Sequence, residues 1–255
     1  MNIKVRIDRT SFIPLYAQVV ESLRAYIESG ELQPGEQLPG EGELCQIFDV
    51  SRTVIRQALA ALEKDALIVR EKGKGTFIAK PKLPERWFQK LTGFHRSYAD
   101  QGYFPRSKVL QQELVTASEK VSDKLNIRLD ADVILIKRLR YVGEEPIALA
   151  TSYFPHHLFP RLLRADLSEQ SLYGYLEAEY GIEIARGHRT FEAVLARTAE
   201  AELLEVPLGA PLLLLESVTY LVNDTPFEYF KALHRGDRSR FELEVSRTNI
   251  MEMQE

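Results

Sequence analysis

The sequence predicts an α+β protein of two domains, a winged helix-turn-helix over residues 12–79 and an antiparallel-sheet α/β domain over residues 91–248. Three observations predict this. Helix-like periodicity and a glycine-containing hairpin fill the first eighty residues, a proline-bearing segment follows, and the remainder alternates strand and helix patterns in two similar halves. The length of 255 residues suits two domains of ordinary size.

Three helices are expected near the N-terminus, over residues 14–29, 41–48 and 51–65. The first has a proline at its start and apolar residues at four-residue spacing, and Gly30 ends it. Ser51 suits the N-cap of the third helix, because its hydroxyl can accept a free backbone N–H. Two β-prone pieces, LIVRE and TFIA, then flank the turn KGKG. Three helices followed by a β-hairpin form the plan of a winged helix.

The net charge of −4 is spread unevenly along the chain. Residues 12–49 hold one basic and seven acidic side chains, whereas residues 50–74 hold six basic and three acidic ones. The second stretch can offer one basic surface to a polyanion while the whole molecule stays acidic. Such a run of charge is also compatible with an ordinary solvated face.

A linker is expected over residues 80–90, where KPKLPER carries two prolines and few groups to bury. The region after it contains an internal repeat. A shift of 79 positions superimposes Val115 on Val194 and Tyr141 on Tyr220, with the same order of strand, helix, long strand, turn and strand. Because hairpin-length turns join the long strands, the repeat predicts one pseudo-symmetric antiparallel sheet.

The third helix carries an apolar side and a polar side. The polar side near its N-terminus, together with the basic wing, predicts contacts to a DNA duplex: an exposed helix start can enter the major groove, and arginine suits guanine. Hydroxyls and the helix N-terminus suit phosphates. The alternative is a structural unit with ordinary surface arginines. The predicted DNA contacts are Ser51, Arg52, Thr53, Arg56, Gln57, Lys72, Gly73, Lys74, Gly75 and Thr76.

Residues 14–78 resemble the DNA-binding domain of the GntR family, through PLYAQVVESLRAYIESGELQPGEQLP, FDVSRTVIRQALAALEKDALI and KGKGTFI. The resemblance implies that Ser51, Arg52, Thr53 and Arg56 contact DNA, with the wing beside them. The sequence departs from the family pattern at Gly40 and Gly42, where Ser or Ala and often Arg stand, and in the turn Asp65-Ala66, where glycine is usual.

Further along the chain, alternation along the strand expected over residues 133–142 places Arg138 and Arg140 on one face, after two isoleucines. Two guanidiniums in such a place are costly to desolvate unless an anion meets them. Two readings are open: a ligand phosphate or carboxylate, and a salt bridge to Glu228 or a neighbouring carboxylate.

Residues from about 91 to 247 resemble the UTRA effector domain of the HutC subfamily, a relative of the chorismate lyase fold, through KRLRYVGEEPIALATSYFP, SLYGYLEAEYGI and PFEYFKALHRGDRSRFE. The resemblance implies a homodimer that binds a small anionic metabolite. A phosphorylated sugar or amino sugar is the first expectation and a carboxylate the second. Ala150 and His234 stand where the family often has Glu and Tyr. The expected effector contacts are Arg138, Arg140, Ser171, Tyr173, Glu228 and His234.

The leading prediction is therefore an effector-responsive regulator that binds double-stranded DNA, most often a repressor. A lyase-like enzyme with a DNA-binding appendage is the alternative, although no convergent acid, base and nucleophile set is evident. No cofactor or metal site is expected, since His156-His157 lacks companions at ligand spacing. The single cysteine, Cys45, and the absence of a long apolar run predict a cytoplasmic protein with no membrane partner.

Overall fold

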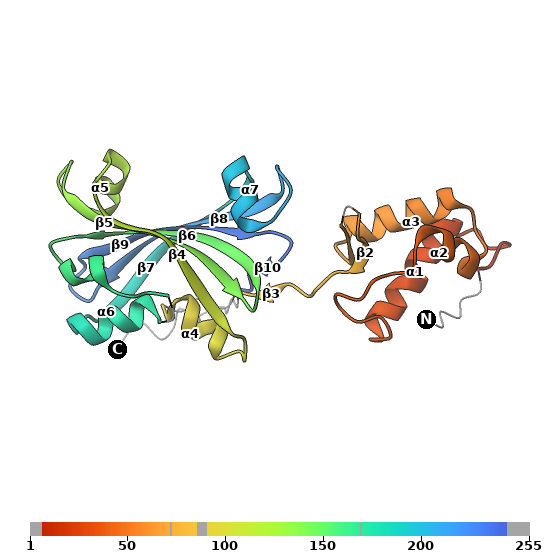
Figure 1. The fold of residues 1–255 in the computed structure, drawn as a ribbon, viewed down its shortest axis with the longest axis horizontal. Helices are drawn as coiled ribbons and strands as arrows, with labels where there is room; N and C mark the ends of the chain where they lie inside the picture. The colour runs from red at the N-terminus through yellow and green to blue at the C-terminus, as the bar shows by residue number, and fades with distance from the viewer. Residues whose placement is uncertain (1–6, 72, 86–90, 169, 244–255) are drawn as a thin grey trace, which may run out of the picture. The chain divides into compact units, whose positions relative to one another are not determined.

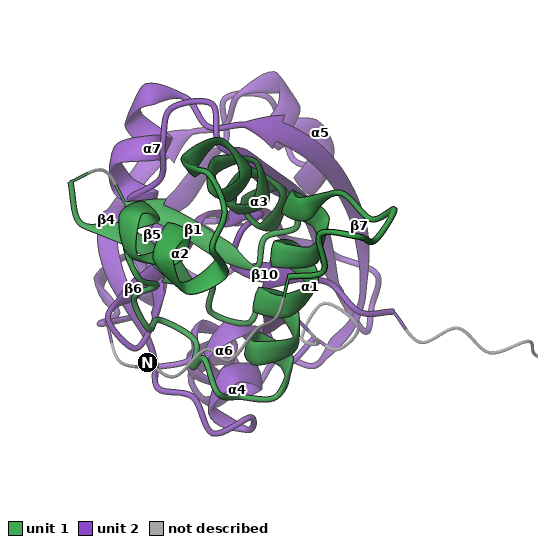
Figure 2. Ribbon diagram, turned by 90° about the vertical axis from the view of Figure 1, so that its right-hand side faces the viewer, with its two compact units in different colours: residues 1–81 green, residues 82–255 purple. Residues whose placement is uncertain are grey.

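The computed structural model describes residues 7–71, 73–85, 91–168 and 170–243. The chain divides into two compact units, residues 1–81 and 82–255 (Figure 1, Figure 2). Each unit has its own hydrophobic core.

Unit 1 consists of three helices and a two-stranded antiparallel hairpin: α1 (Leu15–Glu28), α2 (Glu41–Phe48), α3 (Arg52–Lys64), β1 (Ile68–Glu71) and β2 (Gly75–Ile78). Apolar faces of all three helices meet in one core, where Leu23, Leu44 and Ile55 are fully buried. Ser51 is the N-cap of α3, and its hydroxyl accepts a hydrogen bond from the backbone N–H of Val54 at 3.4 Å. The predicted winged helix-turn-helix is confirmed.

The turn between α3 and β1 has an unusual backbone. Ala66 adopts a φ of 55° there, in the left-handed region that glycine occupies without steric cost. A side chain with a Cβ is disfavoured in this region by about 1–2 kcal/mol. The replacement of the family's glycine by Ala66 therefore leaves a local strain that the rest of unit 1 tolerates.

Unit 2 is built on a six-stranded antiparallel sheet in the order β4-β5-β6-β9-β8-β7. Its elements are β3 (Leu83–Pro84), α4 (Gly93–Ala99), β4 (Pro105–Thr116), α5 (Glu119–Leu125), β5 (Asp132–Val142), β6 (Glu145–Pro155), the 3₁₀ helix η2 (Pro160–Arg164), α6 (Leu172–Tyr180), β7 (Ile184–Leu195), α7 (Thr198–Leu204), β8 (Pro211–Leu221), β9 (Pro226–Arg235) and β10 (Ser239–Arg240). The predicted antiparallel-sheet domain is confirmed.

The internal repeat is visible in this sheet. Strand, helix and two strands (β4, α5, β5, β6) recur as β7, α7, β8 and β9, and the two halves meet at the β6–β9 pair. The helix after each edge strand ends in a left-handed residue, Asn126 in the first half and Glu205 in the second. Each long hairpin changes register just before a tyrosine, Tyr141 and Tyr220. Both pairs are 79 positions apart, as the repeat requires.

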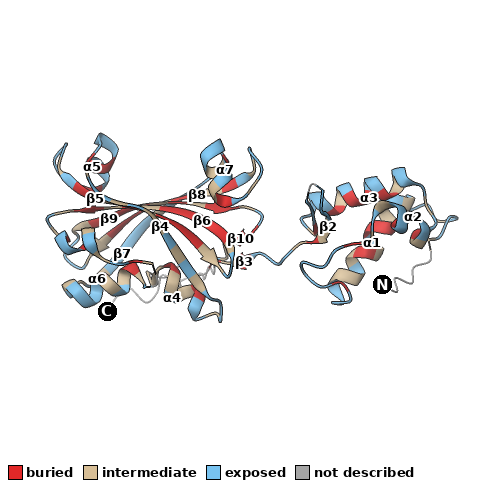
Figure 3. Cartoon of the chain, viewed as in Figure 1, coloured by how far each residue is buried: buried red, intermediate tan, exposed pale blue. Residues whose placement is uncertain are grey.

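Helices cover the two faces of the sheet differently. Helices α5 and α7 lie on one face, and α4 and α6 lie on the other (Figure 1). The inner strands β5, β6, β8 and β9 carry most of the buried positions of the sheet, while the edge strand β7 is largely exposed (Figure 3). Among the residues that the structure describes, no helix has both the length and the apolar character needed to cross a bilayer.

A linker is expected over residues 80–90, but the structure differs from this expectation at residues 83–85. Leu83 and Pro84 form β3, which pairs in parallel with Ser239 and Arg240 of β10. Glu85 is fully buried, so residues 83–85 belong to the body of unit 2. The prediction was wrong here because the two prolines suggested an open chain, whereas the burial of this segment depends on distant partners such as Ser239, which is 154 residues from Glu85.

A reciprocal pair of glycine substitutions tests the strain at Ala66. We expect Ala66→Gly to raise the free energy of unfolding by about 0.5–1 kcal/mol, because glycine adopts the left-handed backbone without a Cβ clash. The same change at Ala60, an exposed position inside α3, should lower it by about 1 kcal/mol, because glycine is the poorer helix former. Thermal melting of the full chain measures both, and equal destabilisation by the two variants would contradict the account of this turn.

Candidate functional site

The N-terminal part of α3 presents a polar surface to solvent. Its opposite face is fixed in the core by Ile55, Ala58, Leu59 and Leu62, so the helix cannot rotate to hide the polar side. The structure brings together the five residues predicted there, all of which are exposed: Ser51, Arg52, Thr53, Arg56 and Gln57. This arrangement is compatible with a helix start that enters the major groove of a duplex.

Helix α2 supports the arginines of α3. Nε of Arg56 donates a hydrogen bond to Oε2 of Glu41 at 2.9 Å, while the Arg56 side chain stays 63% exposed. The ion pair holds the guanidinium at the start of α2 without burying it. A Cβ at Gly42 would lie 4.0 Å from Nη2 of Arg52, so the glycine leaves space beside that side chain. No pattern in the sequence indicated the pairing with Glu41.

The wing is the hairpin of β1 and β2. Gly73 has a φ of 77° and Gly75 a φ of 133°, so both glycines are required by the turn. A Cβ at Gly75 would also collide with the side chain of Gln37, whose Nε2 donates to the Lys74 carbonyl at 2.9 Å. Lys74 is exposed and pairs with Glu71 at 3.0 Å, and Thr76 is half-buried. Lys72 lies outside the described residues.

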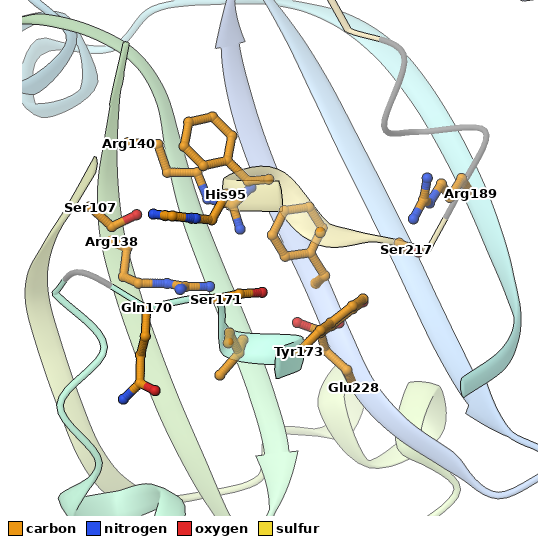
Figure 4. A pocket seen from close by; sticks show the side chains of 14 residues that line it. His95, Ser107, Arg138, Arg140, Gln170, Ser171, Tyr173, Arg189, Ser217 and Glu228 are labelled. Carbon is orange, nitrogen blue, oxygen red and sulfur yellow. The ribbon is translucent and has the colours of Figure 1, made fainter. Parts of the chain in front are cut away.

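Unit 2 contains a partly open cavity, of about 540 Å³ when the solvent space at its mouth is included, on the sheet face that carries α4 and α6. Figure 4 shows Arg138, Arg140, His95 and Ser107 gathered on one side, Ser217 and Arg189 on the other, and Tyr173 and Glu228 between them. The cavity is lined by Gly93, Phe94, His95, Ser107, Arg138, Arg140, Gln170, Ser171, Leu172, Tyr173, Arg189, Ser217, Glu228 and Phe230.

Arg138 and Arg140 are almost completely buried, at 4% and 6% exposure. Within the described parts of the chain neither forms an ion pair, and Nε of Arg138 and both Nε and Nη1 of Arg140 have no hydrogen-bond partner. Arg140 is sandwiched between the rings of Phe94 (4.8 Å) and Phe230 (5.1 Å). Burial lowers the pKa of both arginines, and the positive charge of Arg138 lowers that of Arg140 further. An anion in the cavity would relieve this unfavourable burial of charge.

Glu228 does not form the salt bridge that was the second reading of these arginines. Its carboxylate accepts hydrogen bonds from three hydroxyls instead: Ser152 at 2.9 Å, Tyr173 at 2.5 Å and Thr219 at 3.4 Å. Burial and the nearby Glu228 carboxylate raise the pKa of Tyr173 well above its usual value. Glu228 therefore fixes the Tyr173 ring in the cavity wall and leaves the guanidiniums available to a ligand.

The N-terminus of α6 forms another part of the wall. Ser171 is its N-cap and accepts a hydrogen bond from the Gly174 N–H at 3.2 Å. Gly93, with a φ of 74°, approaches closely, since a Cβ there would lie 3.8 Å from the Ser171 hydroxyl and 3.7 Å from the Tyr173 ring. Helix N-termini attract anions, because their first N–H groups have no partner within the helix. Three arginine side chains and a helix start thus border one cavity.

The structure brings five of the six expected effector residues to this cavity and leaves one outside it. His234 is fully buried, and its Nδ1 lies 3.2 Å from Oε1 of Glu85. The sequence reasoning missed lining residues on α4 and β7, above all His95 and Arg189. Arg189 pairs with Ser217 across the sheet, so strand alternation could have placed it on the cavity face once the strand order was known.

The two halves of the repeat contribute different chemistry to the cavity. Positions 138 and 140 of β5 correspond to Ser217 and Thr219 of β8, 79 residues later. The first half therefore supplies the guanidiniums of Arg138 and Arg140, and the second supplies hydroxyls, the carboxylate of Glu228 and, from β7, the guanidinium of Arg189.

Comparison with known proteins assigns both units. Residues 15–78 match the model of bacterial regulatory proteins of the gntR family, and residues 100–240 match that of the UTRA domain. The chain is 36% identical over 237 residues to the HTH-type transcriptional repressor NagR of Bacillus subtilis (strain 168), covering 93% of this chain and 97% of that protein. It is 32% identical over 234 residues to the mannosyl-D-glycerate transport/metabolism system repressor MngR of Escherichia coli (strain K12), covering 92% and 97%.

Two further relatives agree with this assignment. The probable fructoselysine utilization operon transcriptional repressor of Escherichia coli (strain K12) is 30% identical over 240 residues, covering 94% of this chain and 98% of that protein. Among solved structures, PhnF from Mycobacterium smegmatis superimposes with a TM-score of 0.64 at 26% identity, covering 90% of this chain and all of the other. The chain therefore belongs to the gntR family of bacterial regulatory proteins, as a DNA-binding transcriptional regulator of the HutC type with a C-terminal UTRA domain.

Proposed function

We propose that this regulator is a homodimeric cytoplasmic repressor whose affinity for its operator is controlled by a small anionic metabolite, a phosphorylated sugar or amino sugar. Residues 12–79 would read the operator, and residues 91–248, together with Leu83–Glu85, would hold the effector and the dimer contacts. The observation that carries the proposal is the pair of buried guanidiniums, Arg138 and Arg140, which have unsatisfied N–H groups beside a cavity.

Two features support a sugar derivative as the effector. The guanidiniums and the start of α6 suit a phosphate or carboxylate, and the ring of hydroxyl and amide groups around them suits sugar hydroxyls (Figure 4). The names of two relatives refer to fructoselysine and mannosyl-D-glycerate, which are sugar derivatives.

Binding without turnover is the proposed role of the cavity. Among the described lining residues, Glu228 is the one with a carboxylate, and it is engaged by three hydroxyls and holds the wall together. A ligand acts on transcription if it binds the DNA-incompetent arrangement better than the competent one, since equal affinity for both would shift nothing. Incubation of the full chain with each bound compound, followed by product analysis, tests this role, and catalytic conversion would contradict it.

The test of the effector class is a thermal-shift screen of the full chain against inorganic phosphate, glucose 6-phosphate, glucosamine 6-phosphate and small dicarboxylates. A ligand of the native state stabilises by about 2.7 kcal/mol at a hundredfold excess over its Kd, which raises the Tm by several degrees. A rise with a sugar phosphate supports the proposal. A response to carboxylates alone, or to none of the compounds, would contradict the phosphosugar assignment.

We expect Arg138→Met to abolish the Tm rise with sugar phosphates while leaving affinity for a DNA duplex unchanged. The variant should stay folded, because Arg138 has no ion pair to lose among the described residues and methionine keeps its apolar stem. Arg106→Met is the matched control, since Arg106 is half-exposed and pairs with Glu144. A sugar-phosphate response that survives in Arg138→Met would remove this arginine from the site.

Arg56→Ala should weaken binding to a duplex selected from a random-sequence pool by about 1–3 kcal/mol and relax the preference at one base pair. The reason is the loss of a guanidinium that lies exposed at the start of α3. Lys64→Ala is the control of equal charge at the other end of the same helix, and its effect should be small and uniform over sequences. Fluorescence anisotropy with the selected and a scrambled duplex measures both. Equal effects of the two variants would count against base reading by Arg56.

A further inference from the structure

The segment Leu83–Glu85 lies at the start of unit 2, and only Lys82 separates it from the end of unit 1 at Pro81. Two backbone hydrogen bonds hold it against the C-terminal strand β10. The N–H of Leu83 donates to the carbonyl of Arg238 at 2.6 Å, and the N–H of Glu85 donates to that of Arg240 at 2.8 Å. Any change that weakens this short strand alters the chain that leads to the DNA-binding unit.

The same segment packs behind the effector cavity. Leu83 belongs to a buried cluster that also contains Phe94, Tyr98 and Phe230. Phe94 and Phe230 are the two rings that sandwich Arg140. Phe94 and Tyr98 are both on α4, with ring centroids 4.9 Å apart. The segment is therefore separated from the cavity by one layer of aromatic side chains.

Glu85 adds an electrostatic link. It is fully buried, and Oε1 lies 2.9 Å from the Ser239 hydroxyl and 3.2 Å from Nδ1 of His234. His234, Ala148 and Arg140 lie in one row across β9, β6 and β5, on the same face of the sheet. Because strands are about 4.8 Å apart, the backbones of Arg140 and His234 are about 10 Å apart, with Ala148 as the middle residue of the row. The Glu85 carboxylate thus acts on the same buried region as the Arg140 guanidinium.

We propose that Glu85 is a positioning residue that transmits occupancy of the cavity to the segment Leu83–Glu85, and hence to the chain that leads to the DNA-binding unit. The inference rests on the proposed anionic effector. In the empty protein, the negative charge of Glu85 helps to compensate the desolvated guanidinium of Arg140, and this attraction stabilises β3 in its place.

An anion bound at Arg138 and Arg140 changes the electrostatic stabilisation of Glu85 by Arg140 in two ways. It compensates the guanidinium charge itself, so the contribution of Glu85 is no longer needed. It also brings a like charge into a poorly screened interior, where it repels Glu85. Both effects disfavour the position of Glu85 beside β10 and loosen Leu83–Glu85. By linkage, release of this segment favours binding of the anion to the same extent.

Amide hydrogen exchange of residues 80–85 in the full chain tests this proposal. It is measured by mass spectrometry, with and without saturating inorganic phosphate. We expect phosphate to accelerate exchange of the Leu83 and Glu85 N–H groups in the wild-type protein. In Glu85→Gln, which keeps the shape and removes the charge, exchange should no longer respond to phosphate, although phosphate still raises the Tm. Glu144→Gln, an exposed carboxylate of the same unit, should behave as the wild type does.

The outcomes separate this inference from the proposed function. A phosphate-induced rise in Tm with unchanged exchange at residues 80–85 in the wild type would overturn the role of Glu85, as would a wild-type response in Glu85→Gln. The wild-type measurement tests the response of residues 80–85 to phosphate even when Glu85→Gln does not fold. Absence of any phosphate-induced rise in Tm, or its persistence in Arg138→Met, would instead contradict the proposed anion site.

Discussion

The burial of two adjacent guanidiniums on one face of an antiparallel sheet is the constraint on which unit 2 depends. Arg138 and Arg140 lose their hydration with no carboxylate in ion-pair contact among the described residues, which is a costly state for a charged group. The surroundings reduce that cost in part. Aromatic rings flank Arg140, and Glu228 lies near enough to favour the charged forms. The remainder of the cost is available as binding energy for an anion.

Sequence duplication explains how such a site arises on a symmetric scaffold. The two halves share strand order, left-handed helix ends and register shifts, so the backbone is nearly two-fold symmetric. Side chains at corresponding positions differ, with arginine at 138 and 140 and hydroxyls at 217 and 219. The fold is set by what the halves have in common, and the chemistry of the cavity is set by what distinguishes them. The lining of the cavity can therefore change without a change of backbone.

Much of this protein could be predicted from local sequence. The three helices of unit 1 end within one residue of the expected bounds, because caps and apolar periodicity are properties of neighbouring residues. The antiparallel sheet followed from the repeat and from hairpin-length turns. Alternation along β5 placed Arg138 and Arg140 on one face, which needs only the two-residue period of a strand.

Sequence by itself determined the three helices and the hairpin of unit 1, the apolar face of the third helix, and that two arginines share one side of a strand, because these are local properties. Tertiary structure alone decided what those side chains meet. In the folded protein Glu228 accepts hydrogen bonds from hydroxyls, and Arg189 and His95 line the cavity. Glu85 is buried against β10, where its contact with Ser239 joins residues 154 positions apart. Such distant partners leave no periodic signal in the chain, since they depend on strand order and helix placement.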